Sequence, residues 1–80
     1  MISILIVDDE KKICEFIKAF LDNEGYYTEV AYDGKSAIDK FNSKKYNLII
    51  LDRMIPDISG EEICTYCIWS GVEIWIIEVN

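Results

Sequence analysis

Residues 4–10 are ILIVDDE, and residues 48–52 are LIILD. Each segment is a short run of large apolar residues, which is typical of a strand buried on both faces of a parallel sheet. Each run ends in carboxylates, namely Asp8 and Asp9 in the first segment and Asp52 in the second. If the two strands are neighbours, their carboxyl ends meet at one edge of the sheet, where open α/β sheets bind ligands. The two segments therefore predict an α/β fold with an acidic site at that edge.

Extended and helical patterns alternate along the chain. Four strands are expected at residues 2–7, 27–32, 46–51 and 72–79. Helices are expected over residues 13–21, with Gly25 as the C-cap, over residues 37–41, and from Ser59 to Gly71. Asp33-Gly34 is expected to form a turn before the second helix. The order βαβαβαβ with short crossovers requires parallel strands and right-handed connections.

The first and third helices carry distinct apolar faces. The first is expected to pack on the sheet through residues spaced i, i+3, i+4, i+7 and i+8, which are Ile13, Phe16, Ile17, Phe20 and Leu21. In the third, Ser59 and Glu62 form a predicted capping box. Its buried face is expected to consist of Ile63, Cys64, Cys67 and Ile68.

The composition limits the class of protein. A chain of 80 residues makes one small domain of marginal stability, and a hydrophobic share of 51% excludes a disordered tail. The net charge of −7 argues against nucleic acid or an anionic membrane as a partner. The absence of His removes histidine catalysis, and three Cys do not form a secreted disulfide framework, so a reducing cytoplasm is expected. The apolar runs are far too short to span a membrane.

The three carboxylates at the predicted sheet edge favour a cation site. Like charges at close range raise one another's pKa, and a hard divalent cation such as Mg²⁺ relieves the repulsion. A carboxylate beside such a metal can act as the nucleophile that accepts a phosphoryl group. The alternative is that strand-ending Asp residues are turn formers and helix caps. That interpretation suffices for Asp33 and Asp57, but it does not explain Asp8, Asp9 and Asp52 together at one edge.

Residues 4–10 and the segment LDRMIPDISG, residues 51–60, resemble the two signature segments of bacterial response-regulator receiver domains. The resemblance covers residues 2–68 and is closest to receivers that precede a DNA-binding effector domain in transcription regulators. It implies a flavodoxin-like, three-layer parallel sheet of strand order 2-1-3-4. Residues 1–80 would then be a partial receiver domain, truncated after its fourth strand.

The resemblance also implies roles for individual residues. Asp52 would be the phosphoacceptor, and a sensor histidine kinase would be the phosphodonor. Asp9 would bind Mg²⁺ directly, Asp8 would assist through water, and the backbone carbonyl of Met54 would be a further ligand. Such a domain accepts a phosphoryl group in the cytoplasm and is not an enzyme in its own right.

The chain departs from the receiver pattern at its end. Receivers carry a Ser or Thr at the end of strand four, where this chain has Glu78 or Val79. Their strand-five Lys lies beyond Asn80. Phosphorylation is therefore expected to be impaired, with little structural switching. Two explanations fit this end, namely truncation of an ordinary regulator or altered sequence from about Cys64.

Parts of the sequence also fit functions other than that of a phosphoacceptor. The runner-up is a non-signalling receiver remnant that forms a homo-oligomer through its fourth strand, since residues 74–77 are apolar on both faces. An aspartyl-phosphate hydrolase would need an acid where Met54 stands. Cys64 and Cys67 are interpreted as buried helix residues, and the alternative is a redox pair or, with Cys14, part of a zinc site.

Overall fold

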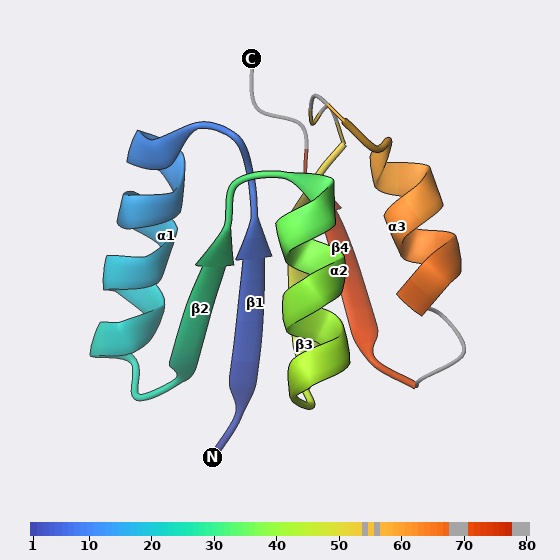
Figure 1. Cartoon of the computed structure of the whole chain (residues 1–80). Helices are drawn as coiled ribbons and strands as arrows, with labels where there is room; N and C mark the ends of the chain where they lie inside the picture. The colour runs from blue at the N-terminus through green and yellow to red at the C-terminus, as the bar shows by residue number, and fades with distance from the viewer. Residues whose placement is uncertain (54, 56, 68–70, 78–80) are drawn as a thin grey trace.

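Four parallel strands form one sheet in the order β2-β1-β3-β4 (Figure 1). The computed structural model covers the whole chain, of which residues 1–53, 55, 57–67 and 71–77 are described. The elements are β1 (Ser3–Val7), α1 (Lys11–Asn23), β2 (Tyr27–Ala31), α2 (Gly34–Ser43), β3 (Leu48–Asp52), α3 (Gly60–Cys67) and β4 (Glu73–Ile77). The predicted α/β class, element order and strand order are confirmed.

The two apolar strands singled out in the sequence are the inner strands of the sheet. β1 pairs with β2 on one side and with β3 on the other, so that Ile6 lies opposite both Val30 and Ile50. Four of the five residues in each of β1 and β3 are buried. Val7 pairs with Leu51, and the residues that follow these two strands therefore emerge side by side at the carboxyl edge.

Helices cover the two faces of the sheet unequally. On one face, α2 and α3 pack over a core that includes Leu5, Leu51, Ala37 and Ile63. On the other face, α1 packs against β1 and β2 and buries Cys14 against Ile4, Ile6 and Ile50, with Ile17 and Leu21 beside them. This arrangement gives three layers, with the acidic strand ends at the upper edge in Figure 1.

The expectation that the whole apolar stripe of the first helix is buried is wrong for two residues. Phe16 is 75% exposed and Phe20 is 61% exposed. The surface of α1 that contacts the sheet is narrower than its apolar face, because α1 packs on β1 and β2 through Cys14, Ile17 and Leu21. The two phenylalanines lie outside this contact line.

Local signals placed most element ends within two residues. The C-cap of α1 is Glu24, and the predicted cap Gly25 follows it with a positive φ of 92°, which is typical of the first residue after a helix C-cap. Asp33 is the N-cap of α2, where its side chain accepts a bond from the amide of Ser36 at 2.7 Å, so the predicted turn is a helix start. Ser59 Oγ accepts from the amide of Glu62 at 3.2 Å, which is one half of the predicted capping box. None of the described helices is long and apolar enough to cross a membrane.

Candidate functional site

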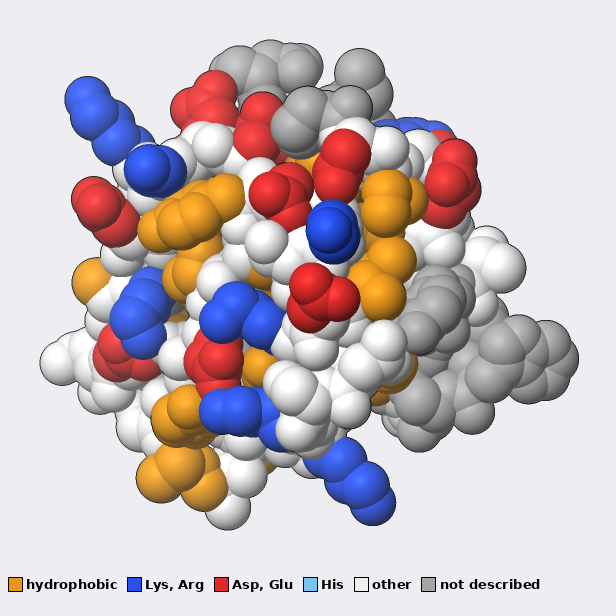
Figure 2. Space-filling model, viewed as in Figure 1, with side chains coloured by type: hydrophobic (Ala, Val, Ile, Leu, Met, Phe, Trp, Pro, Cys, Tyr) orange, Lys and Arg blue, Asp and Glu red, His pale blue; other side chains and the backbone are white. Residues whose placement is uncertain are grey.

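Three carboxylates converge at the carboxyl edge of the sheet. Asp8 and Asp9 follow β1, and Asp52 is the last residue of β3; an oxygen from each of the three lies within 4.8 Å of the others. Asp8 is 1% exposed and Asp52 is 7% exposed, whereas Asp9 is exposed to solvent. Figure 2 shows acidic side chains gathered near this upper edge, while several of the Lys and Arg side chains lie in the lower half of the view. The structure thus brings together the three residues that the sequence singled out.

Asp8 is the member of the cluster whose pKa is raised by its surroundings. Burial raises the pKa of its carboxyl, and the charges of Asp52 and Asp9 raise it further, although a bond from the amide of Glu10 to Oδ1 at 2.9 Å acts in the opposite direction. The other oxygen, Oδ2, is buried and has no hydrogen-bond partner in the described part of the chain. A buried carboxylate oxygen without a donor, beside two more carboxylates, fits a hard oxygen-seeking cation such as Mg²⁺.

The backbone of Asp8 is held from two sides. Its amide donates to the carbonyl of Ala31 at 3.1 Å, and its carbonyl accepts from Cys14 Sγ at 3.2 Å. Burial, followed by the negative charge of Asp8, raises the pKa of the Cys14 thiol to about 11, so the sulfur stays protonated and donates. Cys14 therefore helps to hold the backbone of Asp8 in place. No motif in the sequence indicated this role. A protonated thiol in this place does not favour the zinc alternative.

The loop that follows Asp52 is closed at its base. The amide of Gly60 donates to the carbonyl of Arg53 at 3.1 Å, and a Cβ at position 60 would lie 2.9 Å from the Cα of Arg53. Only glycine permits this approach. Met54, whose carbonyl is an expected ligand, lies outside the described residues, as do Glu78 and Val79.

The sequence predicts a turn former at Asp57, and the structure shows that its side chain also contacts the start of α2. Its carboxylate accepts bonds from the amide of Gly34 at 2.7 Å and from the amide of Lys35 at 3.0 Å. These bonds, the one from Gly34 first, lower the pKa of Asp57. The sequence carries no signal for this contact, because the partners are 22 and 23 residues away along the chain.

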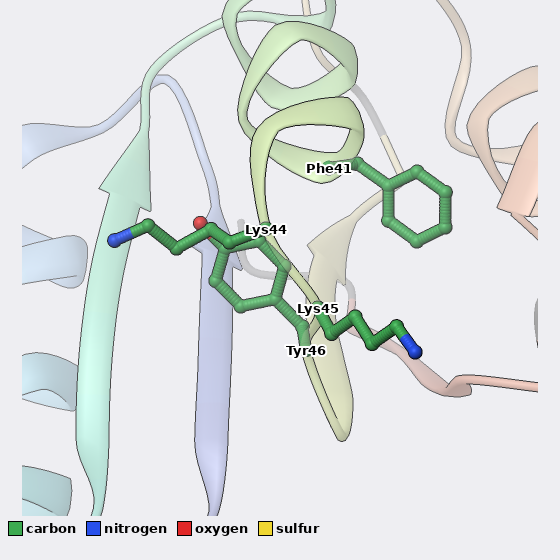
Figure 3. A pocket seen from close by; sticks show the side chains of 4 residues that line it. All are labelled: Phe41, Lys44, Lys45 and Tyr46. Carbon is green, nitrogen blue, oxygen red and sulfur yellow. The ribbon is translucent and has the colours of Figure 1, made fainter.

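The other polar features contribute less to the site. Cys64 is half-buried with a free thiol, and the side chain of Cys67 lies outside the described residues, so the redox alternative is untested. A hollow of about 240 Å³ at the opposite end of β3 is lined by Phe41, Lys44, Lys45 and Tyr46 (Figure 3). Lys44, which points toward β2 in that view, is bound to the carboxylate of Glu29 and to the hydroxyl of Tyr27. The positive charge of Lys44 is thus already paired with a carboxylate of the same chain.

Comparison with known proteins identifies the class of protein that this fold and acidic edge define. Residues 4–77 match the response regulator receiver domain family, and the chain belongs to that family. Receiver domains are signalling modules that bind Mg²⁺ at an acidic pocket and are phosphorylated by sensor histidine kinases. This chain is a receiver domain of a two-component response regulator.

Particular relatives place the chain within the family. It is 47% identical over 64 residues to the response regulator ArlR of Staphylococcus saprophyticus and of Staphylococcus aureus, a match that covers 80% of this chain. The aligned part is 29% of the length of these relatives. The response regulator TrrA of Thermotoga maritima, solved in complex with Mg²⁺ and BeF, is 38% identical with a TM-score of 0.92; the match covers all of this chain and 71% of TrrA. The receiver domain of the Francisella response regulator 1452 is 31% identical with a TM-score of 0.89, over 98% of this chain and 66% of that domain.

Proposed function

We propose that this chain is the phosphoacceptor of a two-component system and that Asp52 receives the phosphoryl group. The observation that carries the proposal is the convergence of Asp8, Asp9 and Asp52, whose oxygens lie within 4.8 Å of one another. Asp52 stands at the end of an inner strand, where parallel sheets present reactive groups to ligands. Its carboxylate is therefore the nucleophile, and Asp8 and Asp9 are its partners.

The chemistry assigned to these residues is a single displacement at phosphorus. A carboxylate oxygen of Asp52 attacks, a P–O bond forms, and the P–N bond to the histidine of the kinase breaks. A bound Mg²⁺ would neutralise negative charge on the transferring oxygens. Asp9, Asp52 and the carbonyl of Met54 would hold the ion directly, and Asp8 would hold it through water. Partial exposure of the site through Asp9 leaves it open to the phosphodonor.

The relatives support the partner and cofactor of this proposal. The TrrA structure, the most identical of the solved relatives described above, contains Mg²⁺ and a BeF group. ArlR is named as a response regulator, and we infer from it a sensor histidine kinase as the partner and a cytoplasmic role in transcription regulation. In that role the chain passes on a signal and catalyses at most its own phosphorylation and dephosphorylation.

Phosphorylation by a small phosphodonor tests the proposal directly. The parent chain, incubated with phosphoramidate and Mg²⁺, is expected to gain one acid-labile phosphoryl group, detected by intact mass. Asp52→Asn should gain none, and chelation of Mg²⁺ should abolish labelling of the parent. Equal labelling of parent and Asp52→Asn would rule out Asp52 as the acceptor.

A second candidate function, self-association, is favoured by the surface of β4. Trp75 is 56% exposed and Ile76 is 43% exposed, and they lie on opposite faces because side chains alternate along a strand. A strand that is apolar and exposed on both faces is a template for pairing with another chain. We infer that the 80-residue chain forms a homo-oligomer through this strand, and a two-fold pair is the commonest arrangement.

Light scattering after size exclusion at low micromolar concentration tests self-association. A dimer is expected for the parent, and Trp75→Lys should shift it toward monomer. Glu15→Lys, at a charged and exposed residue of α1, which packs on β1 and β2 and not on β4, is the control and should leave the mass unchanged. A well-folded parent monomer of 9.3 kDa would contradict this second function.

A further inference from the structure

The loop between β3 and α3 is tied to the first turn of α2 by one side chain. The Asp57 carboxylate accepts bonds from the amides of Gly34 and Lys35, at 2.7 and 3.0 Å. The next amide, that of Ser36, donates to Asp33 Oδ1 at 2.7 Å. The amides at the start of a helix have no partner within the helix. Two carboxylates thus satisfy the first three amides of α2, and one of them comes from a distant loop.

The backbones of the two segments approach very closely at this contact. A Cβ at Gly34 would lie 2.7 Å from the Cβ of Ile58 and 3.0 Å from Asp57 Oδ1. Position 34 must therefore be glycine for the loop to sit where it does. Ile58 packs against the core that α2 and α3 cover. We call the two Asp57 bonds and the Gly34–Ile58 approach the Asp57 clasp.

The same loop is fixed at its other end beside the phosphoacceptor. The amide of Gly60 donates to the carbonyl of Arg53, the residue after Asp52, and Ile55 is buried between the two attachments. Only two residues, Ile58 and Ser59, separate Asp57 from Gly60, so the clasp and the loop base belong to one short segment that is attached at both ends. If Asp57 moves, residues 58–60 move with it, and the bond from Gly60 to Arg53 links this movement to the residue next to Asp52.

We propose that Asp57 is a positioning residue for Mg²⁺ binding at Asp52, acting through residues 57–60 and the bond from Gly60 to Arg53 and not touching the ion. The proposal rests on the function proposed above. A carboxylate suits the task because it accepts two bonds at once, and the positive end of the α2 dipole favours its charge. Residues that hold metal ligands in place without touching the metal commonly matter for affinity, and their loss weakens metal binding by about 10- to 100-fold.

Mg²⁺ titration of the 80-residue chain, followed by intrinsic fluorescence and amide chemical shifts, tests the proposal. Asp57→Ala should raise the Mg²⁺ dissociation constant about tenfold, at the low end for outer partners. Asp57→Asn should raise it less, because the amide oxygen still accepts one bond. Asp39→Ala removes the same charge from an exposed position on α2 and should leave the constant unchanged.

Gly34→Ala breaks the same clasp from the opposite side. Its methyl group would push Ile58 and Asp57 away, so this variant should also raise the dissociation constant. In the double variant the effects should not add, because both changes disrupt one contact. The phosphorylation rate at saturating Mg²⁺ should stay within about twofold of the parent for a residue that only positions a binding site.

The outcomes separate this proposal from the function on which it rests. If Asp57→Ala and Gly34→Ala bind Mg²⁺ as the parent does while Asp52→Asn loses binding, Asp57 has no positioning role. If Asp52→Asn titrates like the parent, the assigned site itself is wrong. A purely structural role for Asp57 would lower the folded fraction without changing the constant measured on folded chains, and this also overturns the proposal. If Asp57→Ala does not fold, Asp57→Asn decides by the same criterion.

Discussion

Asp8 and Glu29 are both largely shielded carboxylates, yet their surroundings are opposite. Asp8 lies among Asp9 and Asp52, and burial raises its pKa. Glu29 lies on β2 within reach of Lys40 and Lys44 and the hydroxyl of Tyr27, and these bonds, the one from Lys44 first, lower its pKa to about 2. The opposite pKa shifts distinguish a carboxylate available for ligand binding from one that stabilises the fold. Glu29 is paired with lysines inside the fold and stabilises it, whereas Asp8 has no cationic partner among the described residues, and an added cation would relieve its charge.

The largest expected effect is the response of the acidic edge to Mg²⁺. At a concentration ten times the dissociation constant, binding to the folded chain alone adds about 1.4 kcal/mol of stability. For a domain of this size the thermal midpoint should therefore rise by about 5–10 °C. Thermal melts with and without Mg²⁺ measure the shift. Asp9→Ala should reduce it strongly, and an equal shift in parent and variant would contradict the assigned site.

Asp8→Asn should stabilise the metal-free chain, because it removes a charge that burial and two neighbouring carboxylates disfavour. The amide oxygen can still accept the bond from Glu10. Urea unfolding at pH 7 without Mg²⁺ measures the change. The same variant should lose most of its response to Mg²⁺, and a destabilised variant would show that Asp8 is held by structural partners instead.

Glu29→Gln should have the opposite sign and a smaller size. Removing the charge weakens the bonds from Lys40 and Lys44 and should destabilise the chain by up to about 1 kcal/mol, the upper value for partly exposed ion pairs. Its response to Mg²⁺ should equal that of the parent, since Glu29 lies on the edge strand away from the acidic site. A changed Mg²⁺ response would mean that the two acids are coupled.

The smallest effect is the pH dependence of these differences. A carboxyl whose pKa is lowered from 4.5 to about 2 contributes stability above pH 4.5 and loses it between pH 4.5 and 2. The gap between parent and Glu29→Gln should therefore close as the pH falls to 2. For Asp8, whose pKa is raised, the penalty of the charge disappears as the pH falls through that raised value. Urea midpoints from pH 7 to 2 would show the two opposite trends, and parallel trends would remove the contrast between the sites.

The sequence predicted that three carboxylates converge at one edge of the sheet, because all three are marked by local patterns. Apolar runs that end in Asp place Asp8, Asp9 and Asp52 at strand ends, and the alternation of elements makes those strands parallel. It misjudged Phe16 and Phe20, since periodicity identifies an apolar stripe but not how much of it a neighbouring sheet covers. It also missed the roles of Cys14 and Asp57. Asp57 acquires its partners only when segments 22 and 23 residues apart are brought together. Cys14 lies only six residues from Asp8, but their contact requires α1 to pack back on the end of β1.

What the sequence by itself determined is the set of elements, their order and the edge at which the carboxylates gather. These follow from hydrophobic periodicity and from turn residues, which act over a few positions along the chain. Only the tertiary structure decided that Asp8 Oδ2 has no hydrogen-bond partner among the described residues and that Glu29 is paired with lysines. That difference depends on distances between β1, β2, α2 and the loops, because burial and Coulomb interactions act through space. Asp8 directly follows β1 and Glu29 lies on the neighbouring β2, and their opposite pKa shifts arise from what the fold places around each of them.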